Sequence, residues 1–181
     1  MITLKELEAI SASKGDMPAD EWAALLESCP EWVAQRDARE AAMQAKEKRY
    51  LEEETPLREA LHRLGYPVKW VWDFVNAKEN YYLDAIPTLI DHLQRPYNDE
   101  IREGIARSLA MKEARGVAGA AVVAVLGESG LSDQLRWALA NTLATVADRS
   151  NRDAIKALLQ RETNKDMADR LNRALKTAAK P

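Results

Sequence analysis

The chain has 181 residues, of which 46% are hydrophobic, 30% are charged and 6% are aromatic. This length predicts one domain, or one domain with an appendage, and the composition excludes a chain that is disordered throughout. The 26 basic and 29 acidic residues leave a formal net charge of −3. Cys29 is the one cysteine, so no internal disulfide can form and a reducing compartment such as the cytoplasm is expected. No apolar run reaches the roughly 18 residues of a membrane helix, and we expect neither a membrane span nor a secretory signal at the start of the chain.

Helix-forming residues dominate the sequence, and runs of β-branched residues are nearly absent. The longest such run, Val122, Val123 and Val125, lies in an Ala-rich stretch that is typical of a buried helix. We therefore predict an all-α protein. At the start of the chain, Thr3 and Glu6 have the spacing of a capping box, which predicts a short helix there.

Residues 1–55 are predicted to be a helical extension that includes a charged arm. From about residue 31 to residue 54 the composition is mainly Ala, Glu, Lys, Arg and Gln, which predicts a helix that is polar almost all round. Such a helix is an exposed arm, a spacer or an oligomerisation element. A coiled coil is disfavoured because apolar a and d positions are not sustained. Residues 56–83 then form a helical junction rich in Trp and Tyr, with Pro56 in the first turn of a helix.

The rest of the chain, residues 84–181, contains an internal repeat. Three segments, 101–109, 135–143 and 167–175, align with offsets of 34 and 32 residues. Each segment follows another apolar segment of helical type, so the unit is a pair of helices. Such pairs stack on one another, because one pair cannot bury its apolar face alone. The equivalent apolar positions are Ile101, Leu135 and Met167; Ile105, Leu139 and Leu171; and Leu109, Leu143 and Leu175.

These segments resemble HEAT repeats. The resemblance lies in AIPTLIDHLQRPYNDEIREGIARSLA (85–110), which includes Pro87, and in DQLRWALANTLA (133–144). It implies an α-α superhelix of about three repeats with a structural ladder between neighbours. The ladder residues that it implies are Asp99, Arg102, Asp133 and Arg136. The third unit has Lys165 and Ala168 at the ladder positions, which suits a terminal capping repeat. The whole chain is also similar to bacterial HEAT-repeat proteins with a helical N-terminal extension, a likeness that implies no activity.

A search for catalytic, cofactor and metal motifs gives no candidate. His62 and His92 are far apart, and neither has further ligand-type residues at metal-binding spacing on both sides. The sequence has no Gly-rich phosphate loop, and Cys29 has no His partner nearby in sequence. The acidic run 52–54 is typical of a solvated cluster. We therefore expect a protein that is not an enzyme and that has no cofactor and no metal.

Aromatic residues gather in the segment 67–82, between the charged arm and the repeats. One interpretation is that this segment packs the N-terminal helices onto the first repeat. The other is that Trp70 or the pair Tyr81 and Tyr82 belongs to a partner-binding patch, since Trp and Tyr are enriched at binding hot spots.

Trp137 is an exception within the repeat, because its equivalents Glu103 and Asp169 are charged. It either fills a groove in this chain or contacts a partner. The residues one turn further along each second helix would line the same surface, and the resemblance to HEAT-like solenoids implies that this surface is used for binding. The candidate partner-binding residues are Trp70, Tyr81, Tyr82, Glu103, Arg107, Trp137, Asn141 and Arg173.

Charge is uneven along the chain. Residues 1–31 hold two bases and seven acids, a net charge of −5, whereas residues 149–181 hold nine bases and four acids, a net charge of +5. The basic end is a solvated face, a site for a complementary protein or a second copy, or a site for nucleic acid.

The leading functional hypothesis is a non-catalytic scaffold or adaptor. It would bind a protein partner through the second-helix surface of the repeats and the Trp-rich junction. One alternative is nucleic-acid binding or processing by the basic C-terminal repeat. Another is a regulatory or toxin-neutralising protein, for which the sequence offers no motif.

Overall fold

The computed structural model describes residues 2–13, 17–76 and 82–179, and in these ranges the protein is helical with no strand. The all-α prediction is therefore confirmed. The chain forms two compact units, Met1–Tyr50 and Leu51–Pro181. None of the helices that the structure describes is both long and apolar enough to cross a bilayer.

The first unit begins with two short helices, α1 (Leu4–Ser13) and α2 (Ala19–Glu27). The predicted capping box is present at α1: the Thr3 backbone N–H donates to Glu6 Oε2 at 2.9 Å, and the Glu6 N–H donates to Thr3 Oγ1 at 3.3 Å. These bonds satisfy two of the N–H groups that a helix leaves free at its start.

The third helix, α3 (Pro30–Glu53), crosses from the first unit into the second and has no buried residue along its whole length. The predicted polar helix is therefore confirmed. Its exposed side chains include Met43, which is 69% exposed. In the first unit as far as it is described, only Leu7 and Cys29 are buried. Cys29 is thus a small core side chain of this unit.

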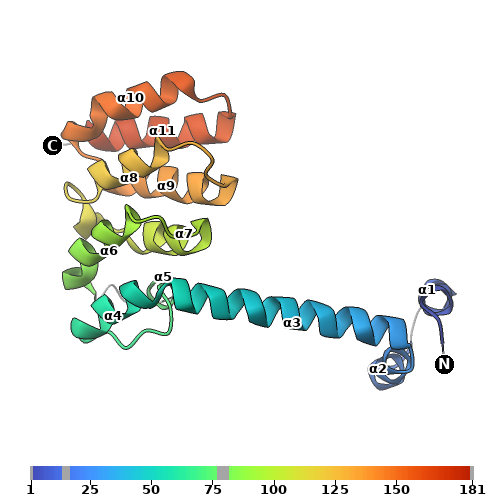
Figure 1. Cartoon of the computed structure of the whole chain (residues 1–181). Coiled ribbons are helices and arrows are strands. Elements are labelled where there is room, and N and C mark those ends of the chain that lie inside the picture. Colours follow the sequence, from blue (N-terminus) through green and yellow to red (C-terminus); the bar gives the residue numbers. More distant parts are fainter. Residues whose placement is uncertain (1, 14–16, 77–81, 180–181) are drawn as a thin grey trace. The chain divides into compact units, whose positions relative to one another are not determined.

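The second unit is a series of helices and single 3₁₀ turns (Figure 1). The helices are α4 (Thr55–Arg63), α5 (Trp72–Val75), α6 (Ile86–Leu93), α7 (Asp99–Ser108), α8 (Gly119–Leu126), α9 (Asp133–Val146), α10 (Arg152–Arg161) and α11 (Lys165–Ala178). The 3₁₀ turns are η1 (Leu83–Ala85), η2 (Lys112–Ala114) and η3 (Arg149–Asn151). The sequence repeat therefore corresponds to the pairs α6/α7, α8/α9 and α10/α11.

The second helices of these pairs pack on one another in order, α7 against α9 and α9 against α11, and each also packs on its own first helix (Figure 1). The repeated apolar positions lie at these contacts. Eight of the nine are buried, and Leu175 on the last helix is half-buried.

The junction segment packs into the same unit, α4 against α6 and α5 against α7. Gly104 on α7 permits the second contact: a Cβ atom there would lie 2.6 Å from Val71 Cγ1 and 3.0 Å from Trp72 Nε1. Both distances are too short for a side chain. Because glycine has none, α5 can pack closely against α7 at this position.

Polar contacts repeat along with the apolar ones. Asn98, Ser132 and Asn164 cap α7, α9 and α11, each accepting backbone N–H bonds through its side-chain oxygen. The Ser132 N–H in turn donates to Asp99 Oδ2, from the preceding repeat, at 2.6 Å. In the same way, Glu53 at the end of α3 accepts from the backbone and side-chain nitrogens of Asn98. A carboxylate thus accepts a hydrogen bond from the capping residue of α7 and another does so from the capping residue of α9.

The repeat arginines form the second part of this pattern. Arg102 on α7 donates to both carboxylate oxygens of Glu128 at 2.8 Å, and Arg136 on α9 pairs with Glu162. Each glutamate lies 26 residues after its arginine, one or two residues beyond the end of the first helix of the next repeat. The arginines of the implied ladder therefore pair with glutamates rather than with Asp99 or Asp133, since Asp99 faces a backbone N–H.

Candidate functional site

The most distinctive surface feature of the second unit is an alternation of tryptophan and arginine across four helices. The Trp137 ring on α9 has Arg170 of α11 over it, with Cζ 4.2 Å from the ring centroid, and Arg107 of α7 at 5.1 Å. Arg107 also lies over the ring of Trp72 on α5, at 5.8 Å. We call these four side chains, Trp72, Arg107, Trp137 and Arg170, the Trp/Arg row. Each contact is of the cation–π type, worth roughly 0.5–2 kcal/mol according to its exposure.

Acidic and amide groups hold the two arginines of the row in place. Arg107 Nη2 lies 2.7 Å from Glu103 Oε1, and Arg170 Nε lies 3.2 Å from Asp166 Oδ2. Arg170 Nη1 also donates to Asn141 Oδ1 at 3.3 Å. Because each guanidinium is fixed by a hydrogen bond as well as by a ring, the row has little freedom to lose on binding.

The row is neither fully buried nor fully exposed. Trp72 and Trp137 are half-buried and pack against the core, while the side chains of Arg107 and Arg170 are 34% and 16% exposed. Trp137 therefore does both things that the sequence left open: it packs within this chain and it keeps a part of its surface open to solvent.

Four of the predicted surface residues lie together in or beside the row. They are Glu103, Arg107, Trp137 and Asn141. Arg173 is exposed on α11 one turn beyond Arg170.

Trp72 and Arg170 were missed in the sequence. Arg170 stands out within the repeat, because the equivalent positions hold the small residues Gly104 and Ala138. This contrast in size was visible in the sequence. Trp72 gave no comparable signal, since its place in the row depends on the packing of α5 against α7.

The Trp-rich junction differs from the expectation of a binding patch. Tyr82 is only 3% exposed, its ring stacks on Phe74 at 4.2 Å between centroids, and its hydroxyl donates to the Ser108 carbonyl oxygen at 3.2 Å. It is a core residue, and the prediction that it lies on a binding surface is corrected. Trp70 is half-buried beside Lys69, whose Nζ lies 4.9 Å from the ring centroid. Tyr81 lies outside the described residues.

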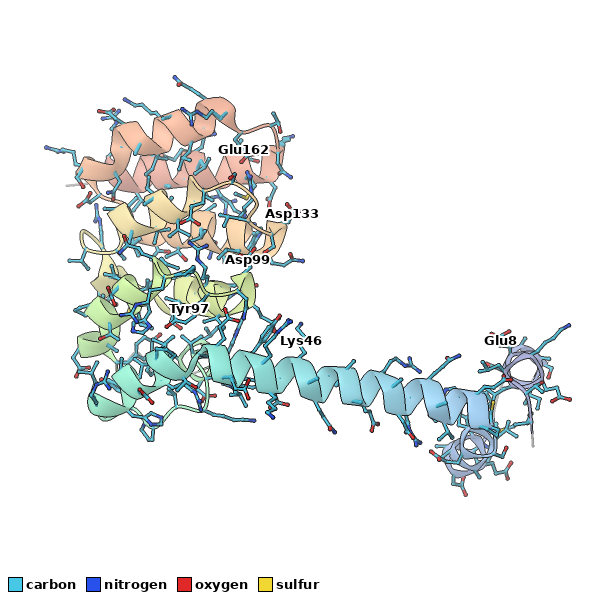
Figure 2. The ribbon with its side chains drawn as sticks, in the orientation of Figure 1. Glu8, Lys46, Tyr97, Asp99, Asp133 and Glu162 are labelled. Atoms are coloured by element: carbon cyan, nitrogen blue, oxygen red, sulfur yellow. The ribbon has the colours of Figure 1, made fainter. Side chains whose placement is uncertain are left out.

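A groove of about 370 Å³ opens beside Trp137, where α9 and α11 begin. Figure 2 shows Asp99, Asp133 and Glu162 in succession along this edge of the second unit. The groove is polar and holds three carboxylates and one guanidinium, so its charge is negative. Its lining residues are Asp133, Arg136, Trp137, Glu162, Thr163, Asn164, Asp166 and Met167.

The two histidines have structural partners. The Nε2 atom of His62 lies 3.0 Å from the Val68 carbonyl oxygen, and His92 Nδ1 lies 2.7 Å from the Tyr97 hydroxyl. Burial lowers the pKa of His92, and nearby Arg95 lowers it further. In the described ranges, no three His, Cys, Asp or Glu side chains come close enough together to hold a metal ion.

Comparisons with protein-family models, with curated proteins and with solved structures each gave no match for this chain.

Proposed function

We propose that residues 84–178 form a HEAT-like α-solenoid, and that the protein is a non-catalytic adaptor that binds a protein partner through the surface of the second helices. The repeated helical pairs, the stacking of α7, α9 and α11, and the arginine–glutamate pairs between repeats support the solenoid. A preformed scaffold of this kind binds by shape and charge complementarity.

The Trp/Arg row is the observation that supports the binding site. Trp and Arg are the residue types most enriched at binding hot spots, and they contribute most where the surface around them is ordered. Here the side chains belong to four helices that pack on one another, and Glu103, Asp166 and Asn141 fix the two guanidinium groups. Such a surface is ordered before binding, so its partner loses little affinity to ordering entropy.

The proposal is tested by partner capture with matched charge reversals. Arg107→Glu removes a guanidinium that faces two rings, whereas Arg161→Glu makes the same change of charge on an exposed residue of the first helix α10. We expect proteins retained by the wild type and by Arg161→Glu to be lost with Arg107→Glu. For a purified partner, Kd should rise by about tenfold or more, or roughly 1.4 kcal/mol.

The role of Trp137 needs a separate measurement, because its ring also packs against the core. If the row serves binding, Trp137→Ala weakens capture while the protein stays folded at working temperature. A loss of roughly 3–5 kcal/mol in the free energy of unfolding, the cost of deleting a core aromatic, would show that Trp137 is structural. An equal loss of capture with Arg161→Glu would show that only overall charge matters.

A further inference from the structure

Glu54 is a carboxyl group in the interior of the second unit. Glu54 follows the last residue of α3, directly precedes α4, and is only 3% exposed. One of its oxygens accepts a hydrogen bond from the backbone N–H of Val71, 17 residues later. Val71 is fully buried and directly precedes α5. A single buried carboxyl group thus connects the start of α4 to the start of α5.

The charges around Glu54 do not neutralise it. Arg58, one turn further along α4, directs Nη2 to the Leu51 carbonyl and to the Thr55 hydroxyl, both at 3.0 Å. Its Nε is the one buried side-chain nitrogen or oxygen without a hydrogen bond among the described residues. The carboxylate of Asp73 on α5 accepts from two backbone N–H groups of its own segment, and it adds a second negative charge close to Glu54.

The segment that Glu54 holds also carries the first member of the Trp/Arg row. Trp72 follows Val71 directly, its ring meets α7 at Gly104, and it faces Arg107. Nothing larger than glycine fits at residue 104 while α5 is docked. A movement of the Val71 backbone away from Glu54 must therefore change the environment of Trp72.

We propose that Glu54 is a proton-operated latch for the α5 segment. With its carboxyl group protonated, α5 is docked on α7 and the row is complete. When the carboxyl group ionises, the cost of a buried charge next to Asp73 favours a looser α5, and Trp72 withdraws from Arg107. The latch is a property of the fold and does not depend on the identity or existence of a binding partner.

The titration falls in a physiological range. Burial raises the pKa of Glu54 to about 7, Asp73 acts in the same direction, and the Val71 N–H and the charge of Arg58 oppose the shift. Tyr97, from the connection between α6 and α7, also interacts with Glu54, and burial raises the pKa of Tyr97 above the ordinary value of 10. It therefore stays neutral while Glu54 titrates.

The test is a pH titration of the full-length protein by ¹H–¹⁵N NMR, following the Val71 amide and the Trp72 indole N–H, with the indole assigned from Trp72→Phe. In the wild type both signals should shift together with a midpoint near pH 7. Hydrogen-exchange protection of the Val71 amide, corrected for intrinsic rates, should fall by about tenfold, and by no more than about thirtyfold, between pH 5 and pH 8.

Two variants and one control make the outcome decisive. Glu54→Gln keeps the shape and the acceptor, and it should abolish both the titration and the loss of protection. Asp73→Asn should move the midpoint to lower pH, and Glu59→Gln, an exposed carboxyl on α4, should leave it unchanged. A Trp72 titration that persists in Glu54→Gln, or a wild-type signal flat from pH 5 to pH 8, would overturn the latch.

Discussion

The charged helix α3 and the repeat helices differ in burial although both are rich in charge. None of the 24 residues of α3 is buried, whereas the 14-residue helix α11 buries Met167, Leu171, Ala174 and Ala178. The apolar residues of α11 recur at helical spacing on one side, and those of α3 do not. The comparison shows that the spacing of apolar residues, rather than the amount of charge, decides which helix joins a core.

The largest expected effect is on the free energy of unfolding, and it tests the difference in burial between α3 and the repeat helices. Leu139 on α9 is fully buried and Met43 on α3 is 69% exposed. Leu139→Ala should lower the free energy of unfolding by about 2–5 kcal/mol through lost burial and a cavity, whereas Met43→Ala should change it by less than about 0.5 kcal/mol. Urea denaturation followed by far-UV circular dichroism measures both. A comparable loss in the two variants would contradict the comparison.

A second prediction concerns the two ion pairs between repeats. In one pair the arginine is the buried member, and in the other the glutamate is the buried member. The Arg102 side chain is 7% exposed and Glu128 is 45% exposed, while Arg136 is 38% exposed and Glu162 is 8% exposed. Removing the exposed partner leaves a buried charge without a counter-charge, which is the costlier change. Glu128→Gln and Arg136→Met should each cost about 2–3 kcal/mol, against about 1 kcal/mol or less for Arg102→Met and Glu162→Gln.

Thermal and urea denaturation of the four variants would measure this asymmetry. It bears on the comparison because α3 lacks buried charges and should show no such dependence on which partner is removed. Equal costs within each pair would mean that the burial of the individual charges does not control their energetics.

The smallest expected effect is a pH dependence of stability that arises at Glu54, the residue that follows α3. Its folded pKa of about 7 lies above that of an unfolded carboxyl group, so the folded protein holds a proton that the unfolded chain releases. The corresponding stability is present below about pH 4.5 and is lost as pH rises through 7. Between pH 5 and pH 8 the wild type should lose about 1–2 kcal/mol more than Glu54→Gln does.

Chemical denaturation at several pH values gives this difference. The lowered pKa of His92 works in the opposite direction in both proteins, so it cancels when the variant is subtracted. A difference that stays constant with pH would show that Glu54 does not titrate on unfolding in this range.

The sequence by itself determined the helical class, the polar character of α3, the capping box at Thr3 and the apolar positions of the repeat. Each of these depends on residues close together in sequence or on a fixed helical period, so local spacing was sufficient. The repeat spacing also predicted that Glu103, Arg107, Trp137 and Asn141 share one surface, because equivalent positions of stacked repeats lie side by side.

Only the tertiary structure decided the remaining features. The burial of Tyr82 against Phe74, the inclusion of Trp72 and Arg170 in the row and the glutamate partners of Arg102 and Arg136 are all contacts between helices. The contact between Glu54 and Val71 likewise joins segments that no sequence period relates. Long-range packing sets such contacts, and it depends on the shapes of both surfaces at once.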